Sequence, residues 1–145
     1  MATPHTPPRV LVVEDDDSLR GALERLLALA GFSAVAYASA EAVMAGGLAE
    51  GAACVVCDLR LPGMSGLELL AVLRARGCRA PLVLITAFDE PGLAGEATSL
   101  GAAGYLVKPF RGTVLLDAVR AAIGPRGAAT ATRPNEAGAG LRERE

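Results

Sequence analysis

Residues 53–66 of the chain read Ala-Cys-Val-Val-Cys-Asp-Leu-Arg-Leu-Pro-Gly-Met-Ser-Gly. The first five residues are uncharged and include two valines, which predicts a buried strand over 53–57. Asp58 ends this run, and the proline, glycines and serine after it predict a turn and the N-cap of a helix over 66–76. A short strand that is apolar on both faces and leads into a helix is typical of a parallel sheet covered by helices.

The same strand-and-helix pattern occurs four more times along the chain. Apolar runs predict further strands at residues 9–13, 33–37, 82–85 and 104–107. Further helices are expected from Asp16 or Asp17 to Gly31, from Ser39 to about Ala49, from Asp89–Pro91 onward, and over 112–123. The helix that starts near Asp89 includes Gly92 and Gly95, so we expect it to be marginally stable. The whole pattern predicts an α/β fold with five parallel strands and five helices.

Length and composition narrow the class of protein. The chain has 145 residues, 52% of them hydrophobic and 3% aromatic, with a formal net charge of −2. This length suits one domain with an aliphatic core, and the charge offers no basic face for nucleic acid. No run approaches the roughly 18 apolar residues of a membrane span, and the N-terminus lacks the apolar region of a signal peptide. These features predict a cytoplasmic domain over 9–123, with a flexible N-terminal tail at 1–8 and a disordered tail or linker stub at 124–145.

The cysteines do not predict a disulfide or metal site. Cys54, Cys57 and Cys78 cannot all pair, which argues against a secreted disulfide framework. Cys54 and Cys57 have the C-x-x-C spacing of redox and zinc sites. In a strand, however, residues three apart point to opposite faces, so we expect both thiols to pack in the core. The only histidine, His5, lies in the Pro-rich N-terminal tail, which further weakens a zinc interpretation.

Polar residues stand where the predicted strands end. They are Glu14 and Asp15, Asp58, Thr86, and Lys108, the only lysine of the chain. Ligands of open α/β sheets bind at the carboxyl ends of the strands, and a pocket with three carboxylates suits Mg²⁺. Asp58 ends a central strand and is the best candidate nucleophile for phosphoryl transfer, whereas Glu14 and Asp15 are better placed to hold the metal. Thr86 and Lys108 would then bind the phosphoryl oxygens.

Four motifs in order give the chain a specific resemblance. They are Val-Val-Glu-Asp-Asp from residue 12, Cys-Asp-Leu-Arg-Leu-Pro-Gly-Met-Ser-Gly from residue 57, Ile-Thr-Ala from residue 85, and Gly-Tyr-Leu-Val-Lys-Pro-Phe from residue 104. Over roughly residues 9–123 the chain resembles the receiver domain of bacterial two-component response regulators. It is similar to chemotaxis-regulator receivers, and most of all to receivers that precede helix-turn-helix output domains. This resemblance implies a flavodoxin-like, doubly wound sheet with strand order 2-1-3-4-5.

The resemblance also implies a metal-dependent phosphoacceptor. Asp58 would accept the phosphoryl group, while Glu14 and Asp15 would form the acidic pair that binds Mg²⁺ or Mn²⁺. Arg60 would lend its backbone carbonyl to the metal. Glu14 stands where aspartate is common in the family, although glutamate is a frequent alternative there.

Further roles follow from the resemblance for the remaining strand ends. Thr86 and Lys108 would contact the phosphoryl group, with a cis peptide bond after Lys108. Tyr105 matches the aromatic switch position, which turns inward when Thr86 moves. Arg60 and Phe88 lie two residues beyond Asp58 and Thr86, at positions that tune how easily water reaches the acyl phosphate, and we expect these bulky side chains to slow autodephosphorylation.

A signalling role, rather than an enzyme acting on a separate substrate, is therefore expected. The donor would be a histidine kinase or a histidine phosphotransfer protein, and the recipient a downstream effector protein or an output domain missing from this chain. The last helix and its neighbours would form the face that binds a partner protein or a second copy of the chain in a homodimer. Neither nucleic acid binding nor membrane insertion is expected. The chain would be a single-domain regulator, the receiver fragment of a longer DNA-binding regulator, or a phosphorylation-independent interaction module.

Two functions on similar folds fit less well. A haloacid-dehalogenase-type phosphatase carries a second aspartate two residues after its nucleophile, where this chain has Arg60. A flavodoxin-type electron carrier needs a first loop of hydroxyls and amides around a phosphate. Here residues 14–17 are four consecutive acids, which would repel phosphate in the absence of a metal.

Overall fold

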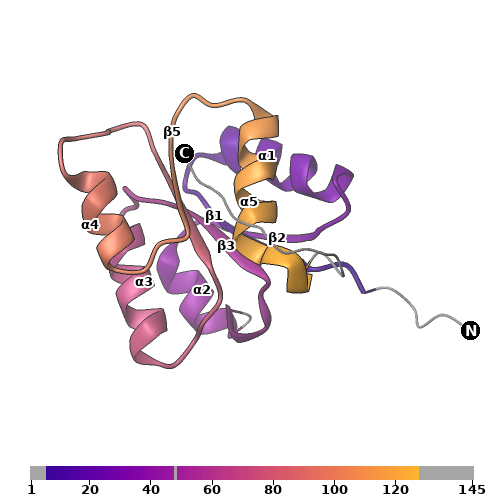
Figure 1. Ribbon diagram of the computed structural model, residues 1–145, viewed down its shortest axis with the longest axis horizontal. Helices are drawn as coiled ribbons and strands as arrows, with labels where there is room; N and C mark the ends of the chain where they lie inside the picture. Colours follow the sequence, from indigo (N-terminus) through magenta and orange to yellow (C-terminus); the bar gives the residue numbers. More distant parts are fainter. Residues whose placement is uncertain (1–5, 48, 128–145) are drawn as a thin grey trace, which may run out of the picture.

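A computed structural model describes residues 6–47 and 49–127 of the chain (Figure 1). Its elements are β1 (Arg9–Val13), α1 (Asp17–Leu29), β2 (Ser33–Tyr37), α2 (Ala40–Gly46), the 3₁₀ turn η1 (Ala49–Gly51), β3 (Cys54–Asp58), α3 (Gly66–Ala75), β4 (Leu82–Thr86), α4 (Leu93–Ser99), β5 (Gly104–Val107) and α5 (Gly112–Gly127). The five strands form one parallel sheet in the order β2-β1-β3-β4-β5, which confirms the predicted fold class. Among the helices of these described residues, none has the length and apolarity needed to cross a membrane.

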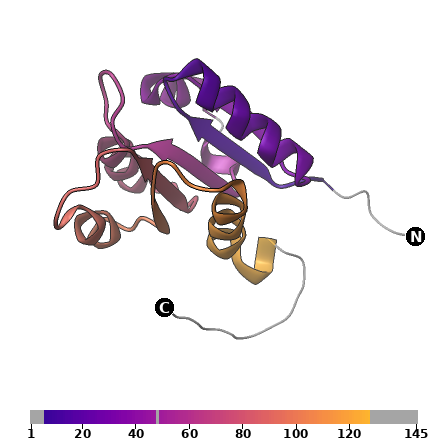
Figure 2. The ribbon, with the colours of Figure 1, turned by 90° about the horizontal axis from the view of Figure 1, so that it is seen from above.

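Helices cover both faces of the sheet. α1 and α5 lie on one face, and α2, α3 and α4 lie on the other (Figure 1; Figure 2 shows the same layers from above). Residues of β1 alternate between the two: Val10 and Val12 pack against leucines of α1 and α5, whereas Leu11 and Val13 pack against leucines of α3. Two separate apolar cores, one on each face, therefore hold the strands in register and bring their carboxyl ends to one edge.

Side-chain caps stand at the start of α1 and α3, where the sequence predicts them. Asp16 accepts a hydrogen bond from the backbone N–H of Leu19 at 2.8 Å and so caps α1. Ser65 and Glu68 form a capping box at the start of α3, each side chain accepting from the other residue's backbone N–H. These caps set the points at which the chain leaves the strand ends and enters the helices.

The cysteines occupy the two cores separately. Cys54 packs in the α1/α5 core and Cys57 in the opposite one, so the two sulfurs of the C-x-x-C spacing do not meet. Burial raises the pKa of the Cys54 thiol to about 12 and also raises the pKa of Cys57. Cys78 is buried as well, and its thiol donates to the Ala49 carbonyl at 3.4 Å. All three are core side chains, which confirms the prediction for Cys54 and Cys57.

Glycine explains two of the differences between the predicted and the observed helix boundaries. α2 ends at Gly46 rather than near Ala49, because Gly47 adopts a left-handed conformation with φ of +71°. The predicted start of α4 at Asp89–Pro91 is wrong. Gly92 has φ of +85°, lies outside the helix as its N-cap, and supplies no side-chain cap, so α4 begins at Leu93.

The last helix contains a break. Its backbone departs from helical geometry at Gly124, with φ of +75°, immediately after the predicted end at residue 123. Helical backbone then resumes to residue 127. The rest of the predicted tail (128–145) and His5 of the N-terminal tail lie outside the described residues.

Candidate functional site

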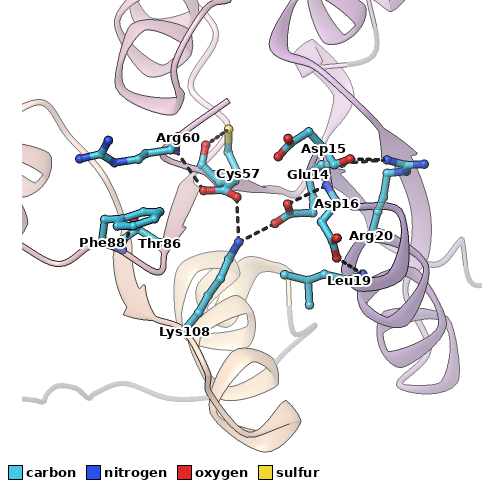
Figure 3. A network of polar contacts seen from close by, with 11 residues as sticks. Glu14, Asp15, Asp16, Leu19, Arg20, Cys57, Arg60, Thr86, Phe88 and Lys108 are labelled. Carbon is cyan, nitrogen blue, oxygen red and sulfur yellow. Dashed lines mark hydrogen bonds and ion pairs between the residues drawn. The ribbon is translucent and has the colours of Figure 1, made fainter. Parts of the chain in front are cut away.

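The carboxyl ends of four strands meet at one edge of the sheet (Figure 3). β1 leads into Glu14 and Asp15, β3 ends at Asp58, β4 ends at Thr86, and β5 leads into Lys108. The registers of β1, β3, β4 and β5 place these ends level with one another. The structure thus brings the predicted strand-end residues to the same edge, as expected for a parallel sheet.

Lys108 joins two of the carboxylates. Its Nζ lies 2.9 Å from Glu14 Oε1 and 2.8 Å from Asp58 Oδ2. The peptide bond that follows Lys108 is cis, which confirms the expectation from the resemblance. A single ammonium directly after β5 therefore holds together the acid that follows β1 and the acid that ends β3.

Asp58 is buried and hydrogen-bonded through both carboxylate oxygens. The residue is only 5% exposed, and its Oδ1 accepts from the backbone N–H of Arg60 at 3.0 Å while Oδ2 contacts Lys108. The first residue of α3, Gly66, lies directly behind it, since a Cβ atom there would come within 2.6 Å of the Asp58 carbonyl oxygen. This close approach of helix and strand fixes the backbone from which the carboxylate projects.

Glu14 is the most buried acid of the site, at 1% exposure. Its Oε2 accepts from the backbone N–H of Asp16 at 3.0 Å. Burial raises the pKa of Glu14, and the charge of Asp58 raises it further, against the lowering effect of the Asp16 N–H and Lys108. Burial alone would lower the pKa of Lys108, but its hydrogen bonds to Asp58 and Glu14 bring the pKa above its ordinary value, so the ammonium stays protonated at neutral pH.

Three carboxylates form a cluster with the donor chemistry of a hard cation. Glu14, Asp15 and Asp58 each offer an oxygen, and these oxygens all lie within 4.8 Å of one another. Asp15 is exposed, whereas the other two are buried, so the cluster is open to solvent on one side. Carboxylate oxygens on an open, anionic site match the ligands and retained waters that Mg²⁺ prefers.

Thr86 is fully buried, and its hydroxyl points to its own loop. Thr86 Oγ1 accepts from the backbone N–H of Phe88 at 3.0 Å. The Thr86 hydroxyl therefore bonds to the β4–α4 connection and not to Asp58. The hydroxyl stands at the same edge of the sheet as the carboxylates while it orders the first residues after β4.

Tyr105 is tied to the same connection from β5. Its ring packs partly buried against the core on the α3/α4 face, and its hydroxyl donates to Asp89 Oδ1 at 2.9 Å. Burial, this hydrogen bond and the charges of Asp89 and Glu90 raise the pKa of Tyr105 to about 12. The phenol is therefore neutral and held by a carboxylate outside the site.

Arg60 and Phe88 lie side by side, although they come from different loops. The Arg60 guanidinium carbon is 4.7 Å from the centre of the Phe88 ring, in a cation–π arrangement (Figure 3). Arg60 Nη2 also pairs with Glu90 Oε2 at 3.2 Å. Both partners of this ion pair are more than half exposed, so the contact spans the rim of the site.

Comparison with known protein families gives a match over most of the chain. The model described as "Response regulator receiver domain" matches residues 10–120. The chain belongs to the response regulator receiver family.

Relatives of this receiver include transcriptional regulators. The chain is 42% identical over 115 residues to the transcriptional regulatory protein FixJ of Azorhizobium caulinodans, covering 79% of this chain and 54% of that protein. It is 45% identical over 111 residues to the response regulator protein FleR of Pseudomonas aeruginosa, covering 77% of this chain and 24% of that protein. The crystal structure of FixJ-N has a TM-score of 0.73 and 31% identity, covering 89% of this chain and 100% of that one. The receiver therefore spans only about half, or a quarter, of the curated relatives that it matches.

Some residues around the receiver site escaped the sequence analysis. Glu90 and Asp89 hold Arg60 and Tyr105, and their pattern in the sequence is that of ordinary loop acids. Arg20 on α1 contacts the backbone behind the acidic pair. Its spacing of three residues from Asp17 on a predicted helix would have indicated the Arg20–Asp17 ion pair, but not the contact with the strand end.

Proposed function

We propose that this receiver accepts a phosphoryl group on Asp58, in a reaction that needs Mg²⁺ or Mn²⁺. One observation carries the proposal: Lys108 bridges Asp58 and Glu14 within 2.9 Å, while Asp15 completes a carboxylate cluster on the open side. Asp58 is thereby a buried, oriented anion beside a fixed positive charge. The donor would be a histidine kinase or a histidine phosphotransfer protein.

The chemistry assigned to each residue follows from its position. An Asp58 carboxylate oxygen attacks phosphorus; a P–O bond forms as the P–N bond of the donor phosphohistidine breaks, and the imidazole leaves with a proton from solvent. The Lys108 ammonium stabilises negative charge on the phosphoryl oxygens. Glu14, Asp15, Asp58 and the Arg60 backbone carbonyl would hold the metal, which supplies Lewis-acid charge neutralisation when bound.

Phosphorylation would be transmitted through Thr86 and Tyr105. A phosphoryl group adds strong acceptor oxygens, and the Thr86 hydroxyl, now an acceptor for the Phe88 N–H, would donate to one of them. The space that Thr86 vacates would admit the Tyr105 ring, at the loss of its bond to Asp89. This exchange would bias α4, β5 and α5 between two arrangements.

The cation–π pair at the rim bears on the lifetime of the phosphoryl group. Arg60 and Phe88, two residues after Asp58 and Thr86, are two large side chains in contact. We propose that they restrict the access of water to the acyl phosphate and so slow its hydrolysis. Replacement of Phe88 by serine should then shorten the lifetime of the acyl phosphate. An unchanged lifetime would show that Phe88 does not slow its hydrolysis.

The output is proposed from the family. FixJ and other relatives are named transcriptional regulators, so residues 9–123 would be the receiver of a longer regulator, joined to it through 124–145. A single-domain receiver that controls a separate effector, as a monomer or homodimer, is the alternative. In either case the role is cytoplasmic signalling rather than turnover of a separate substrate.

The phosphoacceptor is tested with acetyl phosphate and Mg²⁺. Intact-protein mass spectrometry should show one added phosphoryl group on the wild type and on Asp117→Asn, an exposed aspartate of α5. Asp58→Asn should show none, and chelation of Mg²⁺ should prevent the reaction of the wild type. Labelling of Asp58→Asn at the wild-type level would refute the assignment. Absence of label on both the wild type and the variant would favour a phosphorylation-independent interaction module.

A further inference from the structure

Arg20 reaches from α1 to the backbone of both acids that follow β1. Its Nη1 donates to the Glu14 carbonyl oxygen at 3.0 Å and to the Asp15 carbonyl oxygen at 3.5 Å (Figure 3). Its Nη2 pairs with Asp17 Oδ1 at 2.6 Å on the first turn of the same helix. The Arg20 side chain is 23% exposed, so much of it is packed against the loop that it contacts.

These contacts fix a very short connection. Residues 14–16 alone join β1 to α1, and the Glu14 N–H already donates to the Tyr37 carbonyl at 3.0 Å. The Arg20 guanidinium donates to the carbonyl oxygens of the two residues that follow the strand, and no backbone N–H in the described part of the chain donates to either of them. Two successive peptide units are thereby oriented, and with them the directions in which the Glu14 and Asp15 side chains project.

We propose that Arg20 is a positioning residue for the divalent cation: it holds the backbone of the acidic pair so that both carboxylates face the metal. This rests on the proposed Mg²⁺ site. The guanidinium touches the carbonyls and Asp17, not a carboxylate of the cluster, so its effect passes through Glu14 and Asp15.

The direction in which Mg²⁺ affinity changes on removal of Arg20 distinguishes a positioning role from a purely electrostatic one. A cation close to a cation site repels Mg²⁺, so removal of the Arg20 charge alone would strengthen Mg²⁺ binding. Loss of positioning predicts the opposite, a weaker site. Partners behind metal ligands typically change affinity by 10–100-fold when removed, so we expect Arg20→Met to raise the Kd for Mg²⁺ by about 10-fold.

Isothermal titration of the full chain with MgCl₂ at neutral pH measures this effect. Arg25→Met is the matched control, because Arg25 lies on the same helix, is exposed, and carries the same charge. The Kd of Arg25→Met for Mg²⁺ should stay within about twofold of the wild type, since an exposed charge more than a turn further along α1 is largely screened by salt. Arg20→Lys keeps one donor and should recover part of the lost affinity, which a general loss of structure would not allow. Thermal unfolding without Mg²⁺ should show each variant folded at the titration temperature.

Each outcome decides the proposal. An unchanged or lower Kd for Arg20→Met, or a rise equal to that of Arg25→Met, overturns it. If Arg20→Met does not fold, Arg20→Ala, which also has no side-chain donor, is titrated instead, and a wild-type Kd for it also overturns the role. If the wild type binds Mg²⁺ no more tightly than Asp15→Asn, the metal site itself fails, and the role of Arg20 fails with it.

Discussion

The two halves of the receiver site are held in different ways. The acid half is formed by Glu14, Asp15, Asp58 and Lys108. In it, Lys108 pairs with Glu14 and Asp58 at 2.8–2.9 Å, and these three side chains are largely buried, whereas Asp15 is exposed. The loop half, formed by Phe88, Asp89 and Glu90 after β4, is joined by contacts of exposed side chains to Arg60 and Tyr105. The Asp58 carboxylate is thus preorganised, while the segment expected to change conformation is bound by contacts that water can replace.

The helices next to the two halves show the same contrast. α1 has 13 residues, a side-chain cap from Asp16 and two fully packed leucines. α4 has seven residues, an uncapped start at Gly92, and a single buried residue, Ala97. A short, uncapped helix is near the lower limit of stability, so the loop half lies beside the element that is easiest to rearrange.

The largest effect on stability is expected from Lys108→Met. This change leaves Glu14 and Asp58 buried without their counter-ion, and it should lower the free energy of unfolding at pH 7 by about 2–3 kcal/mol, less than for a fully buried pair because Lys108 is partly exposed. Urea unfolding in the presence of a chelator measures it. Arg60→Met, which breaks only the exposed contacts with Glu90 and Phe88, is the control. Equal losses in the free energy of unfolding for Lys108→Met and Arg60→Met would contradict the idea that the acid half is held more firmly than the loop half.

Gly66→Ala should come next. The added Cβ would lie 2.6 Å from the Asp58 carbonyl oxygen and 3.0 Å from Leu59 Cα, both backbone atoms that cannot turn away. We expect a loss of about 1–3 kcal/mol in the free energy of unfolding, because α3 must move off the strand. Urea unfolding measures the loss, and wild-type stability would show that the acid half is less rigid than its contacts indicate.

Gly95→Ala should act in the opposite direction. Gly95 lies inside α4, and its Cβ would meet nothing within 4 Å, so the alanine should stabilise the protein by about 0.5–1 kcal/mol through helix propensity. Gly92→Ala is the contrasting variant, since φ of +85° at Gly92 makes any side chain there unfavourable. The prediction fails if urea unfolding shows Gly95→Ala to be no more stable than the wild type.

The smallest effect on stability is expected from Asp89→Asn. Its loss removes a charged acceptor from the Tyr105 hydroxyl, so the pKa of Tyr105 should fall from about 12 towards 10, while stability at pH 7 changes by less than about 1 kcal/mol. Because the pKa of Tyr105 is raised in the folded state, the neutral phenol stabilises the fold fully below pH 10. This stabilisation is lost as the pH rises towards 12. Ultraviolet absorbance of the phenolate follows the titration, with Tyr105→Phe to identify the signal. An unmoved midpoint would mean that burial alone sets this pKa.

The acid half could be predicted from sequence because it depends on topology. Parallel strands end at one edge, so residues directly after 13, at 58 and directly after 107 had to meet there once five strands were recognised. The loop half could not be predicted in the same way. The contact between Arg60 and Glu90 joins residues 30 positions apart through exposed side chains, and the start of α4 depends on the left-handed backbone of Gly92, which the sequence reading placed inside the helix.

The separation of the two cores by β3 has a spectroscopic consequence. Cys57 and Cys54 lie on opposite sides of the same strand, and the Cys57 thiol donates to the carbonyl of Asp58 at 3.3 Å. The S–H stretching frequency of Cys57 therefore depends on the electron density of the peptide group that carries the candidate phosphoacceptor. The frequency of Cys54 reports on the α1/α5 core instead. Two native thiols provide an infrared probe beside Asp58 and an internal reference, with no label attached to the protein.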